Sequence, residues 1–129
     1  MATIQRFEDI QAWQVARTLT QKVYAFSNSG AFARDFGLRD QTRRAAVSIL
    51  SNIAEGFERG GDAEFLHFLA IAKGSSGEIR SQLYVALDQG YMAAEQFEEL
   101  HEQTVQISRL LSGLMSYLRN SGLKGSKFK

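Results

Sequence analysis

The chain has 129 residues, of which 44% are hydrophobic and 22% charged, and its formal net charge is +1. That length suits one domain with a single apolar core that needs neither a disulfide nor a metal. The absence of Cys excludes a disulfide framework and a thiolate metal site, and it fits a reducing, cytoplasmic location. No stretch approaches the roughly 18 apolar residues of a membrane span, so no membrane partner is expected.

Glycine, rather than proline, divides the chain. Proline is absent, which removes the commonest helix breaker. Glycines at 30 and 37, at 56 to 61, and at 90 leave four segments of about 20 to 27 residues, each long enough for a helix. The first segment, residues 8–27, has the three-and-four spacing of an amphipathic helix. Its apolar positions are Ile10, Trp13, Ala16, Leu19, Val23 and Phe26.

The second segment, residues 38–57, carries an apolar and a polar stripe side by side. The apolar stripe contains Leu38, Ala45, Ile49, Ile53 and Phe57, and the polar stripe contains Arg44, Ser48, Asn52, Glu55 and Arg59. Ser and Asn are poor residues for a helix interior, because their short side chains compete for backbone groups. Their presence therefore indicates specific hydrogen bonds rather than simple solvation.

The third and fourth segments also have helical spacing. The third runs from Asp62, as an N-cap, to a stop at Gly90. The fourth repeats at three and four residues, and its seam consists of Phe97, Leu100, Thr104, Ile107, Leu111, Leu114 and Leu118. No segment alternates with period two. We therefore predict an all-α domain over residues 1–119, an antiparallel up-down-up-down four-helix bundle with short loops.

The register of this bundle predicts which residues face each other. Folding the second and third helices back about Gly60 sets small residues against small ones, which predicts close helix packing at Ala45, Ala46, Gly74 and Gly77. A break of the third helix at residues 74–77 is the alternative. The same register brings Glu78 within reach of the arginines of the second helix. It predicts a structural polar network of Arg43, Arg44, Ser48, Asn52, Glu55 and Glu78, with an RNA-reading patch as the alternative.

Candidate catalytic and metal sites are not supported. Both histidines occur in Glu-x-x-His motifs, at Glu64 to His67 and Glu98 to His101, the spacing used by carboxylate-bridged di-iron bundles. Each motif starts its own helix, and antiparallel neighbours put those starts at opposite ends, about 20 Å apart. No nucleophile with its base is assembled, so we expect no catalytic residue, metal or cofactor.

Charge is concentrated at the C-terminus. Residues 119–129 contain four basic and no acidic groups, whereas residues 1–91 are balanced at ten of each. Residues 120–129 lack helical periodicity and are rich in Gly, Ser and Lys, which predicts a disordered basic tail. Its basic side chains, with those of the preceding helix end, are the candidates for nucleic-acid binding: Arg119, Lys124, Lys127 and Lys129. A solvated tail is the alternative.

Several motifs together resemble one known family. They are Ile10-x-x-Trp13, the run Gln41-x-Arg43-Arg44-Ala45-Ala46-x-Ser48-Ile49-x-x-Asn52-Ile53-Ala54-Glu55-Gly56, the run Phe65-Leu66-x-Phe68-Leu69-x-Ile71-Ala72-x-Gly74-Ser75-x-x-Glu78, and Gly90-Tyr91. The chain resembles the four-helix-bundle proteins encoded in intervening sequences of bacterial 23S ribosomal RNA genes. The resemblance implies a homo-oligomer, commonly a pentamer, and no catalytic activity. A related accessory protein of diversity-generating retroelements implies nucleic acid and a reverse transcriptase as partners.

Two functions follow as expectations. The first is a non-enzymatic, cyclic homo-oligomeric scaffold associated with ribosomal RNA or another nucleic acid, RNA or DNA. The second is an oligomeric adaptor that binds another protein and no nucleic acid. Assembly is expected because apolar residues also lie off the main stripes, among them Val15, Tyr24, Val47, Leu50, Leu66 and Tyr84.

Overall fold

The computed structural model describes residues 4–121 and consists of helices joined by short links. The elements are η1 (Phe7–Asp9), α1 (Gln11–Phe26), α2 (Gly30–Arg34), α3 (Phe36–Glu58), α4 (Asp62–Asp88) and α5 (Ala94–Ser121). No strand occurs among the described residues, so the all-α prediction is confirmed. None of these helices is both long enough and apolar enough to cross a membrane, within the same residues.

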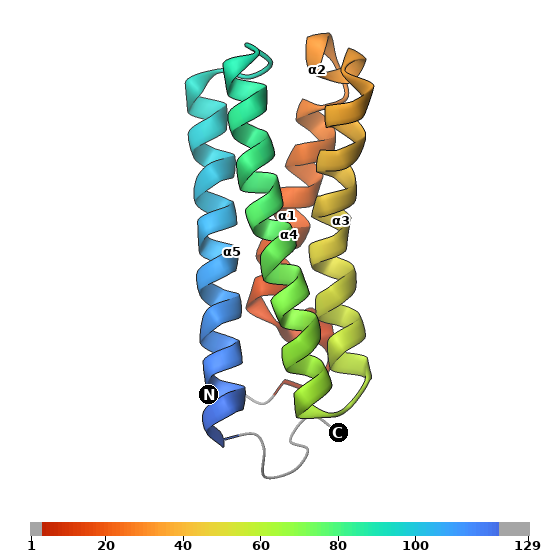
Figure 1. Ribbon diagram of the computed structural model, residues 1–129, viewed down its shortest axis with the longest axis vertical. Helices are drawn as coiled ribbons and strands as arrows, with labels where there is room; N and C mark the ends of the chain where they lie inside the picture. The colour runs from red at the N-terminus through yellow and green to blue at the C-terminus, as the bar shows by residue number, and fades with distance from the viewer. Residues whose placement is uncertain (1–3, 122–129) are drawn as a thin grey trace.

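Four long helices, α1, α3, α4 and α5, lie side by side along the longest axis of the molecule (Figure 1). Helix α3 packs against α1 and α4, and α5 packs against α4 and α1, so each long helix has two neighbours. Helices α3 and α4 are joined at the lower end of the view, and α4 and α5 at the upper end (Figure 1). The core lies between the four.

The core is made by the stripes that the sequence predicts. Ala45, Ile49, Ile53 and Phe57 of α3 are buried, and all seven seam positions of α5 are buried as well. The largest fully buried side chains are spread over the four long helices: Leu19, Ile49, Ile53, Phe65, Leu69, Ile79, Leu83, Leu100, Ile107, Leu111 and Leu118. Burying one such side chain contributes about 1.5 to 3 kcal/mol, so these stripes dominate the stability of the fold.

Glycines and loop side chains set the helix ends. Gly60 has a φ of +88°, which permits the tight link into α4, and Gly90 has a φ of +76° just after α4 ends. The backbone N–H of Tyr91 donates to the carbonyl of Ala86 at 2.8 Å, which closes the end of α4. The N-cap of α4 is Gly61 rather than the predicted Asp62, because Asp62 already belongs to the first helical turn and is buried there.

The predicted loop at residues 28–37 contains a short helix, α2, that sequence spacing did not indicate. Phe32 of α2 is buried and stacks on Tyr91, with 5.6 Å between the ring centroids. The Tyr91 hydroxyl donates to a carboxylate oxygen of Asp35 at 2.9 Å, and the other oxygen of Asp35 accepts from the Leu38 backbone at 3.1 Å. The start of α3 is therefore tied to the α4–α5 link.

Candidate functional site

The polar stripe of α3 faces α4, where its middle part forms a small hydrogen-bonded cluster. The hydroxyls of Ser48 and Ser75 lie 2.9 Å apart. The Asn52 side-chain amide donates to the carbonyl oxygen of Ser48 at 2.8 Å and to its hydroxyl at 2.9 Å. Ser75 is 9% exposed, so these polar groups satisfy each other in a nearly closed environment.

Arg44 and Glu78 also meet across α3 and α4, as the register predicts, but at the surface. Arg44 Nη2 lies 3.1 Å from Glu78 Oε2, and the two side chains are 64% and 39% exposed. The amide of Gln82 donates to the same carboxylate oxygen at 3.3 Å. A pair with this exposure contributes under about 1 kcal/mol, in contrast to a buried pair.

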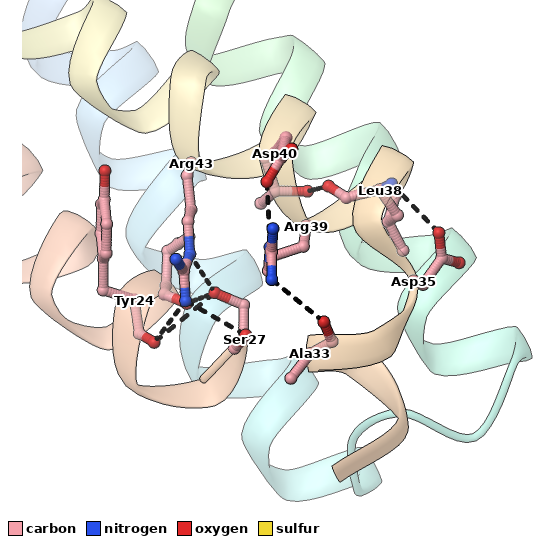
Figure 2. A network of polar contacts seen from close by, with 10 residues as sticks. Tyr24, Ser27, Ala33, Asp35, Leu38, Arg39, Asp40 and Arg43 are labelled. Atoms are coloured by element: carbon pink, nitrogen blue, oxygen red, sulfur yellow. Dashed lines mark hydrogen bonds and ion pairs between the residues drawn. The ribbon is translucent and has the colours of Figure 1, made fainter. Parts of the chain in front are cut away.

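Arg43 turns away from this cluster toward α1. Figure 2 shows its guanidinium reaching the last turn of α1, where Nε donates to the Ser27 hydroxyl at 2.8 Å and Nη2 to the Ser27 carbonyl at 3.1 Å. A longer contact of 3.4 Å joins Nη2 to the Tyr24 carbonyl, and the guanidinium lies 4.6 Å from the Tyr24 ring centroid. Arg43 therefore supplies positive charge to free carbonyl groups at a helix C-terminus.

Glu55 forms a third, separate group near the α3–α4 link. Its carboxylate lies 2.7 Å from Arg59, which also contacts Glu64 at 3.2 Å and lies 5.0 Å from the Phe68 ring centroid. The hydrogen bond from Arg59 to Glu55, supported by the negative charges of both carboxylates, raises the pKa of Arg59. The six predicted network residues thus divide into separate groups rather than one connected network.

The predicted close packing is corrected at its glycines. Ala45 and Ala46 are fully buried, but Gly74 is exposed, and a Cβ there would meet nothing within 4 Å. A Cβ on Gly77 would meet only the Arg80 side chain, at 3.8 Å. The tight contact of α3 with α4 is instead at Gly56, where a Cβ would lie 2.6 Å from Phe68 Cβ. The alternative of a helix break also fails, because α4 is continuous through residues 74–77.

The two histidines lie in separate surroundings. His67 contacts the Phe68 ring, whereas His101 Nε2 lies 3.4 Å from the Tyr84 hydroxyl. Within residues 4–121 no group of three or more His, Cys, Asp or Glu side chains is arranged to hold a metal ion. These contacts give the two Glu-x-x-His motifs no common site.

The basic tail is only partly described. Arg119 is exposed near the end of α5, and Lys124, Lys127 and Lys129 lie outside the described residues. The structure instead reveals basic residues stacked on aromatic rings along α1, which sequence reasoning did not select. Arg17 lies 5.9 Å from the Trp13 ring centroid, four residues away on the same helix face. That four-residue spacing of an aromatic and a basic residue was the available signal.

These observations define a small helical-bundle protein whose polar side chains tie neighbouring helices together. The chain belongs to the family described as 23S rRNA-intervening sequence protein, which matches residues 8–113. No curated protein matches the chain.

A similar solved structure comes from Bacteroides thetaiotaomicron and is described as a protein of unknown function from the S23 ribosomal protein family. Its TM-score is 0.72 at 21% identity, and the match covers 81% of this chain and 95% of that one. At that identity the likeness shows the fold alone.

Proposed function

We propose that the chain is an antiparallel, up-down-up-down bundle that assembles as a cyclic homo-oligomer and acts as a non-enzymatic scaffold associated with ribosomal RNA or another nucleic acid. A pentamer is the assembly that the family resemblance favours. The family assignment supports the link to ribosomal RNA genes, and no residue is assigned a catalytic, metal or cofactor role.

The observation that carries the scaffold proposal is the solvent-facing side of α3 and α4. Val47 and Ile71 are each 40% exposed there, and the same two helices hold the Ser48–Asn52–Ser75 cluster and the Arg44–Glu78 pair. These exposed apolar side chains are available to pack against a second copy of the chain. A second copy of the chain packed on this side would bury Val47 and Ile71 and exclude water from the Arg44–Glu78 pair.

Light scattering on the purified chain tests assembly. A multiple of the 14.4 kDa chain mass at micromolar concentration supports the proposal, and a monomer contradicts it. Glu78→Gln and Asn52→Ala sharpen the test, because removing one partner of a pair buried in the assembly costs about 3 to 5 kcal/mol. Both variants should lower the melting temperature or dissociate the oligomer. If both fold and assemble like the parent but lose nucleic-acid affinity, the cluster is a binding site instead.

A protein adaptor is the second candidate, and the outer side of α4 and α5 favours it. Tyr84 is 49% exposed, and its ring lies 4.9 Å from Phe97 and 5.7 Å from His101. Phe97 is buried beneath this ring, so Tyr84 is the side chain that a partner would contact, and tyrosine is enriched in protein-binding surfaces. A salt-dependent shift of labelled RNA by the purified chain favours the scaffold on nucleic acid, whereas the absence of any shift favours the adaptor.

A further inference from the structure

Helix α1 contains no acidic residue. Between residues 10 and 34 the chain has three basic residues, Arg17, Lys22 and Arg34, and no Asp or Glu. Lys22 is bonded to Glu99 of α5, which neutralises it. Arg17 is exposed, and its guanidinium makes no hydrogen bond or ion pair within the described part of the chain. An exposed cation that forms no ion pair therefore remains on the face of α1 beside α3.

Aromatic side chains accompany the basic ones along this face. Trp13, Arg17 and Tyr24 follow each other at helical spacing on α1, and Arg43 reaches over from α3 to stack on Tyr24 at 4.6 Å. Here these four residues are called the arginine–aromatic strip. Trp13 and Tyr24 are separated by eleven positions, so the strip extends about 16 Å along the helix. Tyr24 is 42% exposed, which leaves part of its ring accessible.

A polar hollow of about 430 Å³ adjoins the Trp13 end of the strip. Trp13 and Arg17 line it, together with Arg6, Gln14 and Gln21 and with Glu8 as its only acidic residue. It presents hydrogen-bond donors and two guanidinium groups, of which that of Arg6 lies 3.5 Å from Asp9 and that of Arg17 forms no ion pair within the described residues. Guanidinium groups are well suited to hold phosphate oxygens. A concave site with this lining suits a phosphate and its sugar better than an apolar ligand.

We propose that the arginine–aromatic strip binds single-stranded nucleic acid, with Arg17 contacting a phosphate and Tyr24 stacking on a base. This inference rests on the proposed association with nucleic acid and names the surface responsible. Single strands combine regularly spaced negative charge with flat π faces, and both features are matched by arginines interleaved with aromatic rings. Arg43 is a positioning residue, because its bonds to the end of α1 hold the Tyr24 ring in place.

The strip carries its own reporter. The chain contains one Trp, and that residue is Trp13. Titrating the full chain with a mixed-sequence single-stranded RNA should quench Trp13 emission with the same dissociation constant that a mobility-shift titration gives. Binding confined to the C-terminal tail or to the α4–α5 side gives a mobility shift without this change in emission, and that result overturns the inference.

Two variants and two matched controls complete the test. Arg17→Gln should weaken RNA binding for all sequences and lower the salt slope by about 0.7. Tyr24→Leu should weaken binding about fivefold to a hundredfold. Arg109→Gln, an exposed arginine on α5, and Tyr84→Leu, a tyrosine of similar exposure, should bind as the parent does.

The outcomes separate the strip from the broader proposal. If the parent binds RNA and the two strip variants bind equally well, the strip is not the binding surface, and the proposed association with nucleic acid stands. If the parent binds no single-stranded RNA or DNA at low salt, both fail. If the strip variants keep their melting temperature but dissociate the oligomer, the strip is a subunit interface, and the inference is overturned.

Discussion

The two halves of the α3–α4 contact differ in how closely the helices approach. Near the link, Gly56 leaves no room for a Cβ beside Phe68, and Phe57 and Phe65 pack edge to face with their ring centroids 5.9 Å apart. In the middle, Ser48 and Ser75 meet through their hydroxyls, and the neighbouring Gly74 faces solvent. Close packing of apolar rings therefore requires a glycine near the link. In the middle of the contact, hydrogen bonding between short side chains joins the two helices.

Replacing the glycine of the close contact by alanine should give the largest change in the free energy of unfolding. Gly56→Ala places a methyl group 2.6 Å from Phe68 Cβ, which lies next to the backbone and cannot rotate away. We expect a loss of about 1 to 3 kcal/mol in the free energy of unfolding, because the two helices must separate. The matched control Gly74→Ala adds a methyl group in open space and should gain up to about 1 kcal/mol from helix propensity.

Thermal denaturation of both glycine variants measures the difference. Each kcal/mol corresponds to about 3 to 6 °C for a domain of this size. A Gly56→Ala protein that melts at or above the temperature of the parent would show that the helices are not in tight contact there.

The adjacent arginines of α3 make the next comparison. Arg43→Gln removes the bonds to the Ser27 hydroxyl and carbonyl and should cost about 1 to 2 kcal/mol, because Ser27 is fully buried and the end of α1 loses its cation. Arg44→Gln removes only the exposed pair with Glu78 and should cost under about 1 kcal/mol in the monomer. Urea denaturation of both variants gives the two free energies, and equal losses would contradict the distinction.

The smallest effect on stability is expected at Tyr91, at the end of the bundle opposite the Gly60 link. The hydrogen bond from the Tyr91 hydroxyl to Asp35, with desolvation and the negative charge of Asp35, raises the pKa of Tyr91. The protonated phenol therefore stabilises the fold at neutral pH. This contribution is fully present below the ordinary tyrosine value of about 10 and is lost as the pH rises through the raised pKa.

Tyr91→Phe should therefore melt slightly below the parent at neutral pH, and the gap should close in alkaline solution. Melting temperatures of the two proteins measured across the alkaline range test this. Because Phe keeps the ring that stacks on Phe32, a gap that is constant with pH would contradict a role for the ionisable hydroxyl and its hydrogen bond to Asp35.

The sequence predicted the long helices well, because their apolar positions recur at helical spacing over many turns. Ile49, Ile53, Leu100 and Ile107 were assigned to the core and are fully buried. The short helix α2 was missed, because five residues give no periodic pattern and Gly30 there has a φ of +66°. Spacing cannot reveal an element that depends on burying a single residue, Phe32.

The candidate site was predicted in part. Register placed Glu78 within side-chain reach of Arg43 or Arg44, and Arg44 does meet it at 3.1 Å. Register gives the level along a helix but not the rotation about it, so Gly74 was placed in the contact although it faces solvent, while Gly56 was passed over. Arg43 was the other candidate partner of Glu78, but it bonds to Ser27 at the end of α1, and no local sequence pattern reports that long-range partner.

The three-residue link at residues 59–61 also bears on the order of folding. It joins α3 to α4 directly, so closing this pair fixes very little chain, whereas the contact of Lys22 with Glu99 closes a loop of more than half the sequence. Loop-closure entropy therefore favours a nucleus in the middle of the chain, with α1 and α5 docking afterwards. High φ-values for conservative mutations in α3 and α4, and low ones at the α1–α5 contact, would be the kinetic signature of this order.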